Sequence, residues 1–273
     1  MSFKSGFLLI ALLAGSYAFP AENDMSIFFD HTDSSSRIVG GTTAGRVPYM
    51  VALTTGAMVR NLLCGGSLVT SRHVLTAAHC IAGGNFVSSL RGHVNTNRFA
   101  SGGTSYSFSS RIIHHGYNAN TIKNDIGLLV TSSNVALSSS VSLAPVNFNF
   151  VGAGVPTTVT GWGRTRSGGS LSQVLLQLSA TVVDGNVCRT RVAQRAQEIS
   201  LRNVPPVNPD VEICTFHSNG RGTCNGDSGS PLMRADRNQQ IGVVSWGLPC
   251  ARNAPDMFVR LSAFRSWFEQ NTR

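Results

Sequence analysis

Short apolar runs, separated by turn-forming residues, recur along most of the chain. Their length and their content of Val, Ile and Thr predict β-strands. These runs are 49–53, 66–69, 73–77, 126–130, 156–160, 174–181 and 241–246. Between the fourth and fifth runs, the Ser- and Pro-containing segment 131–149 indicates a connection between two halves. The pattern therefore favours an all-β protein made of two β units.

A helical period occurs only at the end of the chain. There Phe264, Trp267 and Phe268 would share one face of a helix at about 262–273. Ser262 stands where its hydroxyl could cap the first turn of that helix. We therefore expect two β units closed by a C-terminal helix.

The first residues have the pattern of an export signal. Lys4 precedes the apolar stretch 7–13, and Ser16-Tyr17-Ala18 has the small-x-small form of a cleavage site. That stretch is too short to span a bilayer, which needs about 20 apolar residues. We expect a signal peptide at 1–18, a secreted, extracellular protein and no membrane partner. A buried N-terminal helix is the alternative.

Charge divides the remainder of the chain. Residues 19–37 carry four acidic side chains against Arg37 alone, whereas 38–273 carry 20 basic and 9 acidic residues. The last part of the acidic segment, 33–37, is a polar stretch of the kind that proteases reach. A formal charge of +9 would suit nucleic-acid binding. The arginines are scattered without interleaved aromatic residues, however, so we expect no nucleic-acid partner.

Arginine strongly outnumbers lysine, with 20 arginines against Lys4 and Lys123. Arginine keeps its charge at any accessible pH, whereas a free lysine titrates at a pKa of about 10.4. This bias would suit a strongly alkaline fluid such as a gut lumen. Base composition or drift explains it equally well.

Six cysteines in an exported chain predict three disulfides, because the chain folds in an oxidising environment. Spacing alone does not choose among the possible pairings. A zinc site is the rival interpretation, but no Cys-x-x-Cys pair occurs, which disfavours it. The cysteines are Cys64, Cys80, Cys188, Cys214, Cys224 and Cys250.

Three separate segments together carry the residues for nucleophilic catalysis. His79 follows the apolar run 73–77, Asp125 precedes the run 126–130, and Ser228 lies at the centre of a Gly-rich turn. Each alone has an ordinary structural explanation. Jointly they supply a base, a group that orients the base and a nucleophile, in the chain order His, Asp, Ser. Subtilisins and α/β-hydrolases use other orders.

The chain resembles the trypsin/chymotrypsin family of serine endopeptidases along the whole of residues 38–273. The matching segments are Arg37-Ile38-Val39-Gly40-Gly41, Thr76-Ala77-Ala78-His79-Cys80, Asn124-Asp125-Ile126, Gly161-Trp162-Gly163, Gly226-Asp227-Ser228-Gly229-Ser230-Pro231 and Ser245-Trp246-Gly247. The resemblance implies an all-β fold of two six-stranded antiparallel β-barrels, at about 38–140 and 150–260, with the active site between them.

The resemblance also implies roles for individual residues. Ser228 would attack the substrate carbonyl, His79 would carry the proton, and Asp125 would orient His79. The backbone N–H groups of Gly226 and Ser228 would form the oxyanion hole. Three disulfides are implied: Cys64–Cys80, Cys188–Cys214 and Cys224–Cys250.

Activation is implied at the start of this region. The segment 19–37 would be the propeptide of a zymogen. A trypsin-like protease would cleave after Arg37, and the new amino group of Ile38 would pair with Asp227.

The expected substrate pocket departs from that of a trypsin. Gly222 stands at the pocket base, where a trypsin carries an acid, and Gly247 leaves the mouth open. Ser245-Trp246-Gly247 resembles the segment that pairs with the substrate backbone as an added β-strand, and Asp256 stands on the opposite wall. This combination resembles arthropod digestive chymotrypsin-like enzymes of the brachyurin kind. It predicts a digestive endopeptidase that accepts large apolar or aromatic side chains and, more weakly, Arg; a solvated loop acid is the alternative for Asp256.

Other functions remain as alternatives. A collagenolytic protease of broad specificity is one, and an inactive homologue that acts as a binding protein is another. The presence of His79, Asp125 and Ser228 together disfavours the latter. A regulatory protease of a cascade would often carry a Cys-rich module, for which 19–37 is too short.

Few partners are expected beyond substrates. The family's calcium-loop region would fall at about 91–103, which contains no acid, so we expect no metal and no cofactor. The expected partners are protein or peptide substrates, an activating protease and protein protease inhibitors. We expect the protein itself to be a monomer.

Overall fold

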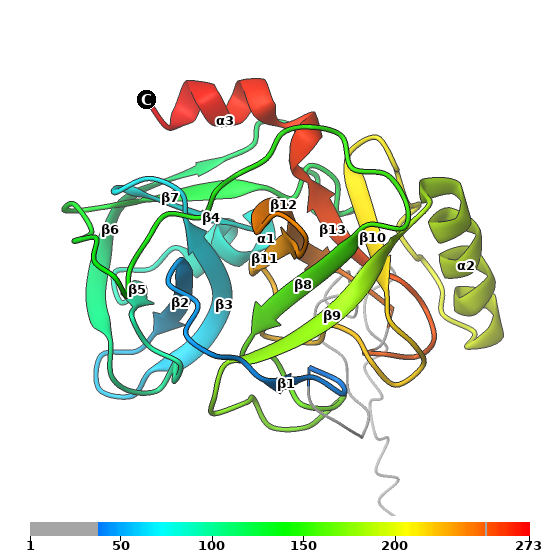
Figure 1. The fold of residues 1–273 in the computed structure, drawn as a ribbon, viewed down its shortest axis with the longest axis horizontal. Coiled ribbons are helices and arrows are strands. Elements are labelled where there is room, and N and C mark those ends of the chain that lie inside the picture. Colours follow the sequence, from blue (N-terminus) through cyan, green and yellow to red (C-terminus); the bar gives the residue numbers. More distant parts are fainter. Residues whose placement is uncertain (1–37, 249) are drawn as a thin grey trace, which may run out of the picture.

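Two bodies of β-strands lie side by side in the computed structural model, with a helix at the C-terminus (Figure 1). The structure describes residues 38–248 and 250–273, so the expected signal peptide at 1–18 and propeptide at 19–37 lie outside the described residues. Among the helices in the described part of the chain, none has the length and apolar content needed to cross a membrane.

The first body is a closed barrel of six antiparallel strands in the order β2-β3-β4-β7-β6-β5. The strands are β2 (Met50–Thr55), β3 (Asn61–Leu68), β4 (His73–Thr76), β5 (Arg91–Val94), β6 (Thr104–Ile113) and β7 (Gly127–Thr131). The apolar runs correctly predicted parts of four of them. Strands β5 and β6 were missed: β5 has only four residues, and β6 is serine-rich and half-buried or exposed throughout.

The second body is also a ring of six antiparallel strands, since β8 pairs with both β9 and β11. Its strands are β8 (Pro156–Gly161), β9 (Leu176–Val183), β10 (Glu212–Phe216), β11 (Pro231–Arg234), β12 (Gln239–Trp246) and β13 (Asp256–Arg260). A two-residue strand, β1 (Thr42–Thr43), adds to the outer side of β9. The expected fold of two six-stranded barrels with a C-terminal helix is therefore confirmed.

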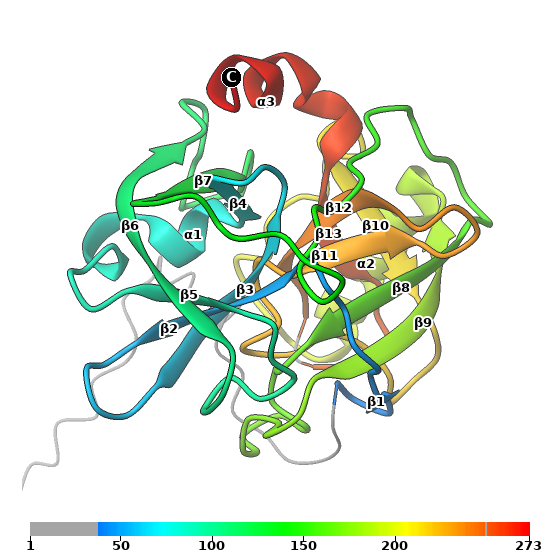
Figure 2. The same cartoon turned by 60° about the vertical axis from the view of Figure 1, so that its left-hand side comes forward.

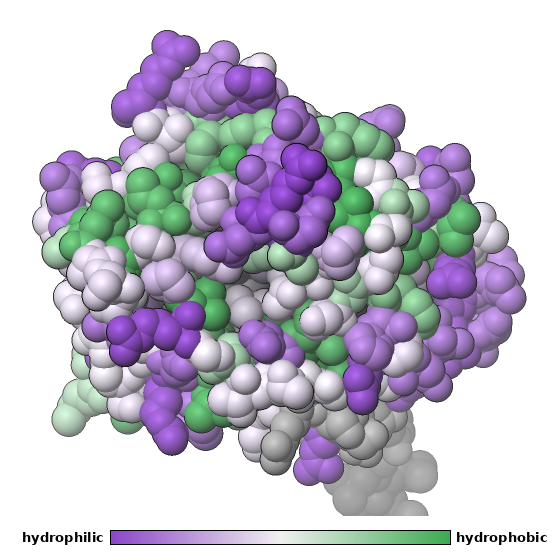
Figure 3. Space-filling view, viewed as in Figure 1, coloured by the Kyte–Doolittle hydropathy of each residue, from purple (hydrophilic) through white to green (hydrophobic). Residues whose placement is uncertain are grey.

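Within the described residues, three α-helices and two short 3-10 turns complete the fold. They are α1 (Ala78–Ile81), η2 (Gly83–Asn85), α2 (Gly185–Glu198), η3 (Leu261–Ala263) and α3 (Arg265–Asn271). The sequence patterns missed α2, whose hydrophilic outer surface shows in Figure 3. Asp184 caps this helix by accepting hydrogen bonds from the backbone N–H groups of Asn186 and Val187.

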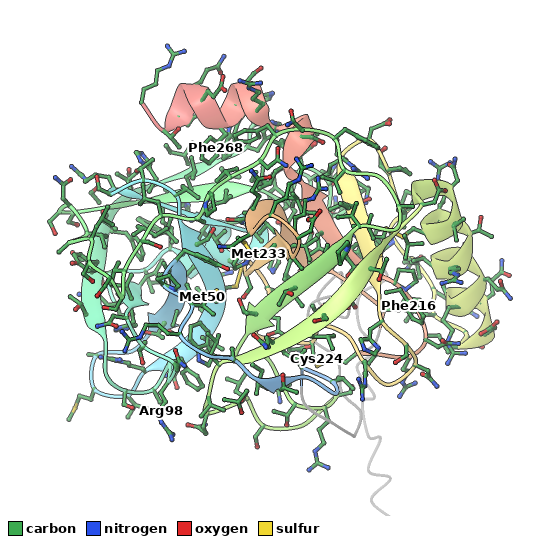
Figure 4. The ribbon with its side chains drawn as sticks, viewed as in Figure 1. Met50, Arg98, Phe216, Cys224, Met233 and Phe268 are labelled. Carbon is green, nitrogen blue, oxygen red and sulfur yellow. A yellow bond between two sulfur atoms is a disulfide. The ribbon has the colours of Figure 1, made fainter. Side chains whose placement is uncertain are left out.

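The predicted N-cap of the last helix is wrong. Ser262 lies inside the 3-10 turn η3, and α3 begins at Arg265 after Phe264, which makes no side-chain capping bond. Phe264 and Phe268 are nevertheless buried, as their spacing predicts, and belong to the apolar core of the first barrel. Figure 4 labels Phe268 beneath the last helix. Phe268 contacts Phe148 with its ring centroid 5.1 Å away.

The apolar packing continues from one barrel into the other. Met233 on β11, labelled in Figure 4, and Val243 on β12 belong to the same buried cluster as the first barrel's core. A buried hydrogen bond crosses the same boundary, from Ser67 Oγ to Gln240 Oε1 at 2.7 Å. The relative position of the barrels is thus fixed by packing and by a specific polar contact.

The two barrels approach each other closely at Gly65 on β3. Its N–H donates to the carbonyl of Ser228 at 2.8 Å. A Cβ at Gly65 would lie 2.0 Å from Ser230 Oγ and 3.2 Å from Ser230 Cα. The turn that carries Ser228 therefore rests directly on the backbone of β3.

We expect Gly65→Ala to destabilise the protein by about 1–3 kcal/mol, because the added methyl overpacks this boundary. Urea unfolding followed by tryptophan fluorescence measures the change. Gly45→Ala is the matched control, since no atom lies within 4 Å of a Cβ at that position. Equal stabilities of the two variants would contradict this account of the interface.

Candidate active site

Strand pairing within the first barrel brings His79 and Asp125 together. Thr76 at the end of β4 pairs with Gly127 at the start of β7, so the residues just beyond these ends are neighbours. His79 Nδ1 lies 2.8 Å from Asp125 Oδ2, and the backbone N–H of His79 donates to Oδ1 at 2.8 Å. Both carboxylate oxygens of Asp125 therefore hold the same histidine. This arrangement fixes the imidazole orientation.

The second barrel supplies a further partner for Asp125. Ser245 on β12 donates its hydroxyl to Asp125 Oδ2 at 2.6 Å. Burial of Asp125 alone would raise its pKa, but the charge of His79 and the hydrogen bonds from His79 and Ser245 outweigh burial. The pKa of Asp125 consequently lies below its usual value, and the carboxylate stays ionised.

Ser228 lies on a sharp turn that leads into β11. Gly226 and Gly229 on either side of it have φ angles of +91° and +78°, which favour glycine. A Cβ at Gly229 would also lie 2.1 Å from Thr76 Oγ1, so the turn packs against the end of β4. Ser228 and His79 line one open cleft of about 280 Å³, together with Gly226. The three residues singled out in the sequence are thus brought together.

The disulfides match the pairs that the family resemblance implies. Cys64–Cys80 joins β3 to α1 next to His79, and Cys224–Cys250 holds the segment before Ser228. The third pair, Cys188–Cys214, fastens α2 to β10. Cys64, His79 and Cys80 come within metal-binding distance of one another, but the disulfide occupies both sulfur atoms.

Asp227 is fully buried beneath the turn. Its oxygens accept hydrogen bonds from the N–H groups of Gly163 at 2.8 Å and Cys224 at 3.0 Å. A Cβ at Gly161 or Gly163 would lie within 2.3 Å of these oxygens, so only glycine fits there. Burial raises the pKa of Asp227 to about 7, although the two backbone hydrogen bonds oppose the rise.

The start of the described chain lies in the same region. Val39 exchanges two backbone hydrogen bonds with Gly222, at 3.0 and 3.3 Å. The preceding residue, Ile38, has no exposed surface. The first residues after the expected cleavage site therefore pack into the body of the second barrel.

Asp256 places a carboxylate between the two glycines of the expected pocket. Its Oδ2 accepts the N–H of Thr223 at 2.8 Å. A Cβ at Gly222 would lie 2.9 Å from Oδ2, and one at Gly247 would lie 3.4 Å from Oδ1. Burial, with a smaller contribution from the charge of Asp227, raises the pKa of Asp256 to about 7, although hydrogen bonds from Thr223 oppose the rise.

Sequence reasoning missed a residue behind Trp246. The buried Glu212 on β10 accepts hydrogen bonds from Trp246 Nε1 at 2.7 Å and from Lys123 Nζ at 2.8 Å. The ammonium of Lys123 also lies 5.2 Å from the centre of the Trp246 ring. The sequence did contain one hint of a special role for Lys123, because it is the single lysine of residues 38–273. Nothing in the pattern around Glu212 identified its partners.

Comparison with known proteins shows similarity over nearly the whole described region. The trypsin family pattern matches residues 38–268. Chymotrypsin-2 of Vespa crabro is 35% identical over 240 residues, covering 86% of this chain and 99% of that protein. Trypsin I-P1 of Gallus gallus is 32% identical over 269 residues, 96% of each protein. The structure of human heparin binding protein superposes with a TM-score of 0.69 at 29% identity, covering 85% of this chain and 95% of that one.

We expect Ser245→Ala to lower kcat/KM for a small ester about tenfold, because one charge-assisted hydrogen bond to Asp125 is lost. Asp125→Asn should cost about 10,000-fold, since it also loses the preferred imidazole tautomer. Initial rates of ester hydrolysis measure both effects. Equal losses in the two variants, or no loss in Ser245→Ala, would contradict this division of roles.

Proposed function

The chain belongs to the trypsin family of serine endopeptidases, and on this premise we propose that His79, Asp125 and Ser228 are its catalytic triad. The observation that carries the proposal is the hydrogen-bonded chain from Ser245 through Asp125 to His79, with Ser228 in the same cleft. The protein substrates that the family implies would bind across this cleft.

The proposed reaction proceeds through an acyl-enzyme. Ser228 Oγ attacks the carbonyl carbon of the scissile bond while His79 accepts the hydroxyl proton. His79 then gives this proton to the departing amine, and water repeats the sequence to release the acid and restore Ser228. The N–H groups of Gly226 and Ser228 are proposed to stabilise the oxyanion. Asp125 stabilises the imidazolium and keeps it oriented.

The pocket supports a chymotrypsin-like preference with an unusual addition. Gly222 and Gly247 bring no side chain of their own into the expected pocket, which is compatible with a large aromatic or Leu side chain of the substrate. The Asp256 carboxylate lies against both glycines and can pair with a substrate arginine when it is ionised. The neighbouring carboxylate of Asp227 raises the pKa of Asp256 by charge repulsion. We therefore propose that protonated Asp256 favours apolar side chains and that ionised Asp256 admits Arg.

We expect the ratio of kcat/KM for an Arg substrate to that for a Phe substrate to rise with pH, around the Asp256 pKa of about 7. The ratio cancels pH effects on the shared chemical steps, because both substrates react through the same catalytic groups. Asp256→Asn should show a low ratio at every pH. If the wild-type ratio stays constant from pH 5 to 9, the carboxylate does not act in the pocket.

Activation is proposed to depend on the burial of Asp227. Cleavage after Arg37 would give Ile38 a new ammonium group, and a cation beside Asp227 would stabilise its buried carboxylate. The same pairing raises the pKa of the ammonium above its free value of about 8. Activity should therefore persist into alkaline solution and disappear as pH rises through the amine's raised pKa.

We expect a fluorophosphonate to label Ser228 only after the protein is cleaved at Arg37, for example by trypsin. Arg37→Gln should remain uncleaved at that site and unlabelled, whereas Asp227→Asn should be cleaved but label poorly. N-terminal sequencing and mass spectrometry report the two steps. Labelling of intact Arg37→Gln at the wild-type rate would overturn the zymogen mechanism, and no labelling after cleavage would overturn the catalytic role of Ser228.

The biological setting is proposed to be extracellular digestion by a monomeric enzyme. Three disulfides are consistent with an oxidising, extracellular location. Relatives at 32–35% identity include both chymotrypsins and trypsins, so they do not distinguish between these specificities. The proposed digestive role and brachyurin-like subtype therefore rest on the composition of the pocket. An activating trypsin-like protease and protein inhibitors are the proposed partners beyond substrates.

A further inference from the structure

The first barrel is almost free of carboxylates. No Asp or Glu occurs between Asp33 and Asp125, whereas residues 38–124 contain six arginines and one lysine. Asp125 itself is committed to His79 and Ser245. Among the ion pairs found in residues 38–248 and 250–273, none involves Arg60 or Arg91. These two cations therefore have no carboxylate partner in the described structure.

Both arginines line one cavity of about 310 Å³ in the first barrel. It lies among β2, β5 and β6, which are adjacent strands (Figure 2), and beside the turn that joins β2 to β3. Every polar side chain in its lining is neutral or basic. They are Thr54, Arg60, Ser89, Arg91, His93 and Ser105.

Backbone carbonyls hold the two guanidinium groups in place. Arg60 Nη1 donates to the carbonyl of Gly102 at 2.8 Å. Arg91 Nη1 donates to the carbonyls of Ser88 and Leu90 at 2.7 and 2.8 Å. Each guanidinium has five N–H donors, so anchoring through a single nitrogen leaves donors for a ligand. The arginines are thus positioned before any ligand arrives.

His93 adds an unsatisfied buried group to this cavity. The residue is 3% exposed, and its Nε2 lies 2.8 Å from Thr54 Oγ1. Its Nδ1 is buried and has no hydrogen-bond partner. Burial first, and then the charges of Arg60 and Arg91, lower the pKa of His93 to about 4. A buried ring nitrogen without a partner is costly, and it belongs to the histidine that lines the cavity beside both arginines.

We propose that the cavity lined by Arg60, Arg91 and His93 binds a tetrahedral oxyanion, either phosphate or sulfate, free or as an ester on a larger molecule. Two guanidinium groups provide charge-assisted hydrogen bonds, and the hydroxyls of Ser89 and Ser105 can donate to further oxygens. A bound anion offsets the charge of both arginines at His93, so it raises the pKa of that imidazole. The site does not depend on the proposed catalytic function.

The test uses the full-length chain with Ser228→Ala, which prevents self-digestion, in sodium chloride buffers of constant ionic strength. Calorimetric titration with inorganic sulfate and with inorganic phosphate should show saturable binding of one anion per protein. Arg60→Gln should weaken this binding about tenfold or more, because it removes charge-assisted hydrogen bonds. Arg98→Gln is the control: Arg98 is an exposed arginine of the same barrel outside the cavity lining, and its removal should leave the affinity within about twofold.

A second readout separates specific binding from a general effect of salt. Histidine NMR should show that the saturating anion raises the pKa of His93 and leaves that of His73, outside this cavity, unchanged. Saturation with either anion supports the site, and the anion that binds more tightly indicates whether a sulfate or a phosphate group is preferred. Absence of saturation with both anions, equal weakening in the two arginine variants, or an unmoved His93 pKa overturns the proposal.

Discussion

The structure depends most on a single buried carboxylate that both barrels share. Asp125 belongs to the first barrel and holds His79 through both of its oxygens, while Ser245 of the second barrel donates to the same group. A buried carboxylate is stable only when such donors surround it. The contact that keeps Asp125 ionised is therefore also a contact that requires the barrels to be docked. Catalytic geometry and tertiary assembly are coupled at one residue.

Close backbone contacts extend this coupling to the nucleophile. Gly65 and Gly229 let β3 and the Ser228 turn touch without intervening side chains. On the other side of the turn, Gly161 and Gly163 leave space for the carboxylate of Asp227. Side chains at these positions would separate elements that have to meet. The glycines of this protein thus set distances between elements as well as turn conformations.

Some parts of the fold and of the site could be predicted from the sequence, and others could not. Buried strands with continuous apolar runs, such as 126–130, were visible, and the resemblance supplied the order of the catalytic residues and the disulfide pairs. Strand β6 and helix α2 were missed, because β6 has no fully buried residue and α2 exposes most of its residues, so neither shows a clear apolar period. The partners of Glu212 come from segments distant in the chain, so only the folded structure could show that it holds Trp246 in place.

Lys123 has a chemical consequence for anyone who handles this protein. It is the only side-chain amine in residues 38–273, and its pairing with Glu212 leaves it 15% exposed. Reagents that acylate amines at neutral pH will thus find one poorly reachable side chain in the body of the protein. The amino group of Ile38, which we propose to be buried beside Asp227 after cleavage, offers no better target. Arginine- or carboxylate-directed chemistry is therefore the better route to immobilise the folded enzyme.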